Sequence, residues 1–287
     1  MKKIKFGILG GDHRYKILKQ LLEDEGYTVY SYCSKFIEGP EESLESLFEK
    51  SDVIIGPIPF SRNNKSLALN DCREENLENL FSNMQQHGLT LLFCGAVGKD
   101  VRELSEKYNI TVYDFFAMEE VAVKNAVPTA EGAVQSAMNE SEQTIFKSRV
   151  LVLGYGRCGK ALANLLKGMG AYVDVACRSK AAAAEVYASG LESIEFGELK
   201  ERIVGYDHVF NTVPSLVIDR EMLGYMNKDT IITDIASAPG GVDFNAAAEA
   251  GIKALYCPGL PGRVAPKTAA IILKDALLPL TLSHFSK

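Results

Sequence analysis

Three glycines, at positions 154, 156 and 159, stand between the apolar stretch "RVLVL" and the helix-like stretch "KALANLLKGMG". This G-x-G-x-x-G spacing is typical of a turn that binds the pyrophosphate of a dinucleotide where a strand leads into a helix. Gly154 would allow the tight turn, Gly156 the close approach of the phosphates, and Gly159 the packing of helix on strand. The N–H groups that open the helix would face the anion. We expect the whole turn to contact the dinucleotide, through Gly154, Tyr155, Gly156, Arg157, Cys158 and Gly159; a turn without a ligand is the alternative.

The residues about 20 positions further on bear on which dinucleotide binds. A site for NAD would place an acidic residue there, but this chain reads Cys-Arg-Ser-Lys from Cys177. Arg178, Ser179 and Lys180 could bind a 2′-phosphate, because a guanidinium pairs with phosphate oxygens or stacks on adenine. The sequence therefore favours NADP. The alternative is that Arg178 is a solvated residue and that NAD binds without an acidic anchor.

Two loops follow later predicted strands, "NTVPS" from Asn211 and "DIASAPGG" from Asp234. Ligands of open α/β sheets lie outside the carboxyl ends of the strands, so these loops should complete the pocket. Asn211 and Thr212 could offer hydrogen bonds near the nicotinamide ribose, although Asn-Thr-x-Pro is also a good turn sequence. The further cofactor contacts expected here are Asn211, Thr212, Val213, Pro214, Ala236 and Gly259.

The elements that must position these residues follow from alternating short apolar runs and helix-like segments. In the first half the pattern predicts strands near 4–9, 27–33, 51–59, 89–96 and 110–116, with helices at 14–25, 70–87 and 99–108. In the second half it predicts strands at 149–153, 171–176, 208–212, 230–235 and 252–256, with helices at 157–168, 180–188, 243–250 and 266–282. Nearly all-apolar strands are typical of parallel sheets covered on both faces.

The stretch 117–145 between the two halves carries alanines and valines at helical spacing and predicts one long helix, or two broken at Pro128. The predicted fold is α/β, with two Rossmann-like doubly wound parallel-sheet domains joined by this linker helix. We expect a substrate-side domain over 1–117 and a linker plus NAD(P)-binding domain over 118–287, with the last helix able to return to the first domain.

Composition narrows the function classes. The 287 residues carry a formal net charge of −6 and no Lys/Arg cluster, which argues against nucleic acid or an anionic membrane as partner. No uninterrupted apolar run approaches the roughly 20 residues of a membrane helix, and the first residues lack a signal-peptide core. The six cysteines are scattered without ligand spacing, so we expect reduced thiols, no metal site and a cytoplasmic protein.

Several strings together resemble one family, the A subunit of dipicolinate synthase. They are "GGDHR" (10–14), "NAVPTAEGA" (125–133), "GYGRCGKALA" (154–163), "NTVPS", "DIASAPGGVDF" (234–244), "PGLPG" (258–262) and "APKTA" (265–269). Adenosylhomocysteine hydrolases and D-2-hydroxyacid dehydrogenases share the linker helix and the glycine spacing, so the tail from "ASAPGGVDF" onward is the specific part. The resemblance covers nearly the whole chain.

The resemblance implies an enzyme of a spore-forming bacterium, acting in the late lysine branch in the cytoplasm of the mother cell. It would oxidise dihydrodipicolinate or hydroxytetrahydrodipicolinate to pyridine-2,6-dicarboxylate, with a nicotinamide cofactor taking the hydride. The family also implies a partner, the flavoprotein-like B subunit of the synthase. We further expect a homo-oligomer.

A dicarboxylate substrate needs cations or backbone N–H donors, because an unpaired carboxylate in a closed cleft is costly. We expect Arg14 and Lys267 to serve first, and the turn at Gly11 and Asp12 to hold an anion through backbone amides. The remaining candidate cations are Arg62, Lys124 and Arg263. The alternative for each is a solvated surface charge.

Aromatisation also requires a proton to leave, so a base is useful. His13 is the first candidate, with Asp12, Lys124 and Glu131 behind it; a lone loop histidine is more often a plain polar contact. A D-2-hydroxyacid dehydrogenase would carry a histidine after the last cofactor-domain strand, where this chain reads "YCPGLPG". A non-catalytic NADP-binding regulatory subunit stays open as an alternative, because binding motifs do not establish chemistry.

Overall fold

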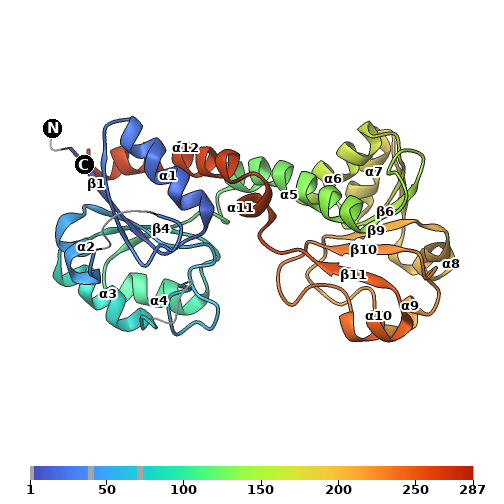
Figure 1. Ribbon diagram of the computed structural model, residues 1–287, viewed down its shortest axis with the longest axis horizontal. Helices are drawn as coiled ribbons and strands as arrows, with labels where there is room; N and C mark the ends of the chain where they lie inside the picture. The colour runs from blue at the N-terminus through green and yellow to red at the C-terminus, as the bar shows by residue number, and fades with distance from the viewer. Residues whose placement is uncertain (1–2, 38–41, 70–73, 287) are drawn as a thin grey trace. The chain divides into compact units, whose positions relative to one another are not determined.

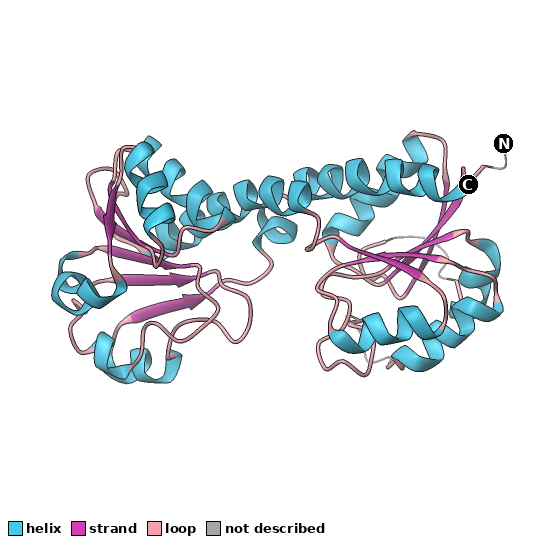
Figure 2. Ribbon diagram, turned by 180° about the vertical axis from the view of Figure 1, so that it is seen from behind, coloured by secondary structure: helices cyan, strands magenta, loops and turns pink. Residues whose placement is uncertain are grey.

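The computed structural model describes residues 3–37, 42–69 and 74–286. The chain divides into two compact units, Met1–Lys124 with Ala265–Lys287 and Asn125–Val264. Each unit is built on one parallel sheet, and helices cover both faces of it (Figure 1 and Figure 2). The predicted α/β class with two doubly wound sheets is confirmed. The division falls inside the linker helix α5 (Glu119–Glu140), and the last helix α12 (Pro266–Phe285) belongs to the first unit.

The first sheet has the strand order β2-β1-β3-β4-β5, with every pair parallel. Its strands are β1 (Lys5–Leu9), β2 (Thr28–Tyr32), β3 (Val53–Ile55), β4 (Leu91–Cys94) and β5 (Thr111–Asp114). One face packs against α2 (Leu44–Lys50), α3 (Leu77–Gln86) and α4 (Lys99–Lys107), and the other against α1 (His13–Asp24) and α12. The central strands β3 and β4 are buried throughout, and they read as continuous apolar runs because both faces of the sheet are covered there.

α12 passes a test of length and apolar composition for a membrane span, the one such helix among the described residues. In this structure it packs along α1, and Ala270, Leu273 and Leu277 are fully buried in the core of the first unit. We interpret α12 as a core helix, because its buried residues belong to the core of the first unit and core helices of soluble proteins pass the same test.

The second sheet has the order β11-β10-β9-β6-β7-β8 and is also parallel. Its strands are β6 (Arg149–Leu153), β7 (Tyr172–Ala176), β8 (Glu192–Ile194), β9 (His208–Asn211), β10 (Ile231–Asp234) and β11 (Lys253–Tyr256). One face carries α5, α6 (Arg157–Gly168), α7 (Lys180–Ala188) and α11 (Leu260–Val264); the other carries α8 (Leu199–Arg202), α9 (Arg220–Leu223) and α10 (Phe244–Ala250).

The structure departs from the predicted elements in two ways. The helix predicted over 70–87 begins only at Leu77, because Asn76 caps it and Ser66 pairs with Asn76 as a β-bridge; residues 70–73 lie outside the described part. α2, β8, α8, α9 and α11 were not predicted, since elements of three to seven residues show little periodicity. The linker is one helix through Pro128, which confirms the first of the two predicted alternatives, and buried alanines lie on both sides of the proline.

His208 on β9 is a buried histidine without a hydrogen-bond partner at either ring nitrogen. His208 is 1% exposed, and burial lowers the pKa of its imidazole from the usual value. Below about pH 6.5 His208 is protonated in the unfolded chain, while in the folded protein its lowered pKa keeps it neutral. The free energy of unfolding therefore falls as the pH drops through that range. We expect His208→Phe to remove on the order of 1 kcal/mol of this loss between pH 7 and pH 5, measured by urea unfolding. An unchanged pH profile in the variant would contradict this account.

Candidate functional site

The glycine turn between β6 and α6 has the backbone geometry that a dinucleotide requires. Gly154 lies at φ +95°, and a Cβ there would stand 2.5 Å from Oγ1 of Thr212. A Cβ on Gly159 would stand 2.2 Å from the carbonyl oxygen of Gly154, so only glycine lets helix and strand approach this closely. Gly156 differs from both, since a Cβ at this position would meet nothing within 4 Å.

The space above Gly156 lies at the N-terminus of α6. Gly156 is the N-cap residue and no side chain caps the helix, so its first N–H groups are not engaged by a capping side chain. Open space beside such N–H groups fits an anion such as a pyrophosphate. Strand order also reverses between β6 and β9, which places the turn at the topological switch point of the sheet. The residues present therefore fit a dinucleotide.

The side chains of the turn have different surroundings. Tyr155 is largely buried, and its hydroxyl forms a hydrogen bond with Oγ of Ser189 at 3.0 Å. This bond ties the glycine turn to the residue that follows α7. Cys158 is half-buried, and burial raises the pKa of its thiol. Arg157 is exposed, while Gly259 lies at φ +66° in the loop after β11. The thiol of Cys158 is therefore a packing group in this structure rather than a thiolate.

Arg178 stands exposed just beyond the carboxyl end of β7. Its guanidinium carbon lies 5.3 Å from the ring centre of Phe196, and stacking on the ring limits the positions it can take. Ser179 caps α7 by accepting from the N–H of Ala182, and Lys180 is exposed in the first turn. Cations at a helix N-terminus fit a phosphate group. The sequence did not reveal Phe196, because it sits on a short 3-10 helix with no recognisable pattern.

The two later loops are held together by a buried polar cluster. Asn211 is 0% exposed; its amide donates to the carbonyl of Val213 and to Asp234, and its oxygen accepts from the N–H of Val213. Each polar atom of the Asn211 side chain thus bonds to the loops, and its contact with a bound cofactor stays a prediction. Thr212 donates to the carbonyl of Leu153 at 2.8 Å and fixes the loop to the glycine turn. Ala236 is buried, whereas Pro214 is exposed.

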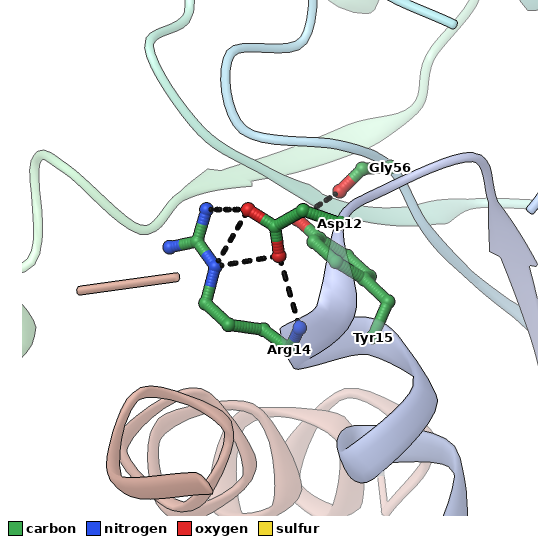
Figure 3. Close-up of polar contacts among 4 residues, drawn as sticks. All are labelled: Asp12, Arg14, Tyr15 and Gly56. Atoms are coloured by element: carbon green, nitrogen blue, oxygen red, sulfur yellow. Dashed lines mark hydrogen bonds and ion pairs between the residues drawn. The ribbon is translucent and has the colours of Figure 1, made fainter. Parts of the chain in front are cut away.

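In the first unit, the turn after β1 is built around an ion pair. Asp12 caps α1 by accepting from the N–H of Arg14, and the guanidinium of Arg14 donates to both carboxylate oxygens, at 2.7 Å in its shortest contact (Figure 3). Arg14 is 5% exposed. A substrate carboxylate would have to compete with Asp12 for the Arg14 guanidinium, so the predicted contact between Arg14 and the substrate stays a prediction.

Neighbouring contacts keep this turn rigid. The hydroxyl of Tyr15 donates to the carbonyl of Gly56 after β3 at 2.9 Å, and burial raises the pKa of Tyr15 far above its usual value (Figure 3). Gly11 lies at φ +94°, and a Cβ there would stand 2.4 Å from the Tyr15 ring. The order of the sheet reverses between β1 and β3, so the turn and Gly56 occupy its switch point.

The other predicted site residues lie apart from this cluster or are exposed. His13 is exposed, with its ring edge-on to Phe36 at 6.2 Å between centres. Lys124 lines a hollow of about 190 Å³ with Glu120, Asp275 and Pro279. The remaining candidates, all at least partly exposed, are Arg62, Glu131, Arg263 and Lys267. Among the described residues, no group of three or more acidic, histidine or cysteine side chains could hold a metal ion.

Two protein families match this chain, one over the residues of each sheet. The family of N-terminal domains of the dipicolinate synthase A subunit matches residues 5–116, and "Alanine dehydrogenase/PNT, C-terminal domain" matches residues 125–287. The A subunit of dipicolinate synthase from Bacillus subtilis (strain 168) is 32% identical, over 96% of this chain and 95% of that protein. Adenosylhomocysteinase of Thermoplasma volcanium is 24% identical over 45% of this chain and 35% of its own length.

Solved structures agree with these matches. The A subunit of dipicolinate synthase from Bacillus halodurans has a TM-score of 0.86 at 29% identity, over 96% of this chain and 97% of that chain. The A chain of dipicolinate synthase from Bacillus subtilis has a TM-score of 0.84 at 30% identity, over 99% and 97%. D-lactate dehydrogenase from Escherichia coli has a TM-score of 0.70 at 15% identity, over 99% and 98%, and shares the fold alone. The fold is thus shared with dipicolinate synthase A subunits and with a D-lactate dehydrogenase.

Proposed function

The chain belongs to the family of dipicolinate synthase A subunits, and from that premise we propose that it is an NAD(P)-dependent oxidoreductase that forms dipicolinate. The substrate class would be dihydrodipicolinate or hydroxytetrahydrodipicolinate. The observation that carries the proposal is the glycine turn, where open space at Gly156 adjoins the N-terminus of α6. A bound nicotinamide would accept the hydride.

The proposed reaction is a two-electron oxidation of a CH–CH bond. One ring carbon of the dihydro substrate loses a hydride and a neighbouring position loses a proton, which restores the aromatic ring; a hydroxylated substrate loses water as well. The second unit would bind the dinucleotide through the glycine turn, and the exposed loop at Val213 and Pro214 would flank the nicotinamide. His13, exposed at the start of α1, remains our candidate for taking the proton.

The substrate carboxylates would need partners besides Arg14. The cations Arg62, Lys124 and Lys267 in the first unit, and Arg263 in the second, are accessible enough to serve them. The turn at Gly11 and Asp12 remains our candidate position for one carboxylate, because it lies at the switch point of the first sheet. Asp12 itself is fully engaged with Arg14, which makes it a weak candidate for a base.

We propose that NADP is the preferred cofactor, because Arg178, at the end of β7, has no carboxylate partner among the described residues. Arg178→Ala should weaken NADP⁺ binding about tenfold or more, the loss of one charge-assisted hydrogen bond, while NAD⁺ binding changes less than about twofold. Calorimetric titration of the purified variant measures both constants. Equal losses for the two nucleotides would contradict a 2′-phosphate site at Arg178.

The family name implies a second polypeptide, so we propose that the B subunit of the synthase associates with this chain. We also propose a homo-oligomer and, from the same family premise, a location in the cytoplasm of the mother cell of a sporulating bacterium. Size-exclusion chromatography with light scattering, on the chain alone and with the co-expressed B subunit, measures both associations.

The experiment that tests the function is titration with NADP⁺ and NAD⁺, with and without pyridine-2,6-dicarboxylate, followed by turnover with a system that generates hydroxytetrahydrodipicolinate. We expect nucleotide binding that the dicarboxylate strengthens, and formation of NADPH together with dipicolinate. Nucleotide binding without turnover, even when the B subunit is present, would favour a regulatory NADP-binding protein. Failure to bind either nucleotide would refute the proposal.

A further inference from the structure

Asp234 is a fully buried carboxylate at the carboxyl end of β10. It accepts three hydrogen bonds, from the side-chain amide of Asn211 at 2.8 Å and from the N–H groups of Ala236 at 3.0 Å and Gly241 at 2.8 Å. Each of these partners donates to the carboxylate, so the cluster solvates its ionised form.

Within the described part of the chain, no cation neutralises this charge. Among the ion pairs of the described residues, none includes Asp234, and each of its three donors is an uncharged amide. Buried aspartates are ordinarily paired with a cation, because an isolated charge in a region of low dielectric constant is costly. The interior of the second unit therefore carries an uncompensated negative charge at this strand end.

The charge lies beneath the loops that should flank a bound nicotinamide. The N–H groups of Val217 and Ile218 donate to the carbonyl of Gly241, which joins the loop after β9 to the loop after β10. The loop after β9 is in turn fixed to the glycine turn by Thr212. Ligands of such sheets lie outside these same strand ends.

Resting on the proposed function, we infer that Asp234 sets the preference of the site for the oxidised cofactor. The oxidised nicotinamide ring carries a positive charge and the reduced ring does not, while the rest of the dinucleotide is the same. A buried negative charge nearby stabilises the oxidised form selectively, because few mobile ions can screen it. The protein would thus bind the hydride acceptor more tightly than the reduced product of the reaction and release that product readily.

The test compares the dissociation constants of NADP⁺ and NADPH, measured by calorimetry on the purified full chain. We expect NADP⁺ to bind the unaltered protein at least about threefold more tightly than NADPH. Asp234→Asn keeps the shape of the side chain and removes the charge, together with at least one of the three accepted hydrogen bonds, so the ratio of the two constants should shift toward NADPH by on the order of fivefold. The readout is binding and does not depend on turnover.

The control is Asp229→Asn, which makes the same change of net charge at an exposed residue before the opposite end of β10. It should leave the ratio unchanged. Asp234→Asn weakening both nucleotides equally would mean that Asp234 only shapes the loops, and the inference would fail while the proposed function stood. Should the variant not fold, tighter binding of NADPH than of NADP⁺ by the unaltered protein would overturn the inference. Binding of neither nucleotide would overturn the proposed function and the inference with it.

Discussion

Gly156→Val should weaken nucleotide binding at least about 30-fold and leave the fold intact. The backbone of Gly156 is extended, at φ −77° and ψ −167°, and a Cβ meets nothing within 4 Å, so valine fits the protein without strain. The same side chain would occupy the space in which the pyrophosphate must approach the N–H groups of α6. Losing those charge-assisted bonds costs on the order of 2 kcal/mol or more, at least about a 30-fold weaker constant by calorimetric titration.

Two variants of the same helix serve as controls for this result. Gly168→Val makes the identical change at the far end of α6, also in open space, and should leave nucleotide binding unaltered. Gly159→Ala forces a Cβ against the carbonyl of Gly154, so it should lower the melting temperature as well as the affinity. If Gly156→Val binds NADP⁺ with unchanged affinity, the turn does not hold the pyrophosphate.

The predictable part of this site is the part set by local backbone geometry. Gly154 must adopt a positive φ and Gly159 must tolerate a backbone contact, and each requirement leaves a glycine at a fixed spacing in the sequence. The two sheets were predictable for a similar reason, because strands buried on both faces read as apolar runs between helical segments. These signals need no knowledge of what lies nearby in space.

The sequence did not reveal which partners two of the candidate side chains acquire on folding. Arg14 follows a glycine-rich turn, as a substrate-binding arginine would, yet its charge is used by Asp12 two residues earlier once α1 forms. Asn211 stands at a strand end, as a ligand-binding asparagine would, yet Asp234 on the neighbouring strand engages its amide. Sequence indicated the edge of the sheet correctly, but it could not tell which polar groups satisfy one another.

Loss of one partner of the Asp12–Arg14 pair is expected to lower the stability of the first unit. Asp12→Ala removes the N-cap of α1 and leaves the guanidinium of Arg14 buried without a counter-charge. An unpaired buried cation costs several kcal/mol, while a lost cap costs about 1 kcal/mol. Since the Asp12 side chain is 35% exposed, water can enter and moderate the loss. We expect a decrease of about 3 kcal/mol in the free energy of unfolding, measured with urea.

A double-mutant cycle separates the cap from the ion pair. Asp12→Asn keeps one oxygen that can cap α1 and removes the charge together with one acceptor, because an NH2 group cannot accept from the guanidinium. Arg14→Met removes the cation while retaining most of the apolar contact. The double variant Asp12→Asn/Arg14→Met should be more stable than Asp12→Asn alone, because it no longer buries an unpaired charge. Additive losses in the cycle would show that the pair contributes through packing only. Nucleotide binding by the second unit should be unchanged in all of these variants, since the ion pair belongs to the first unit.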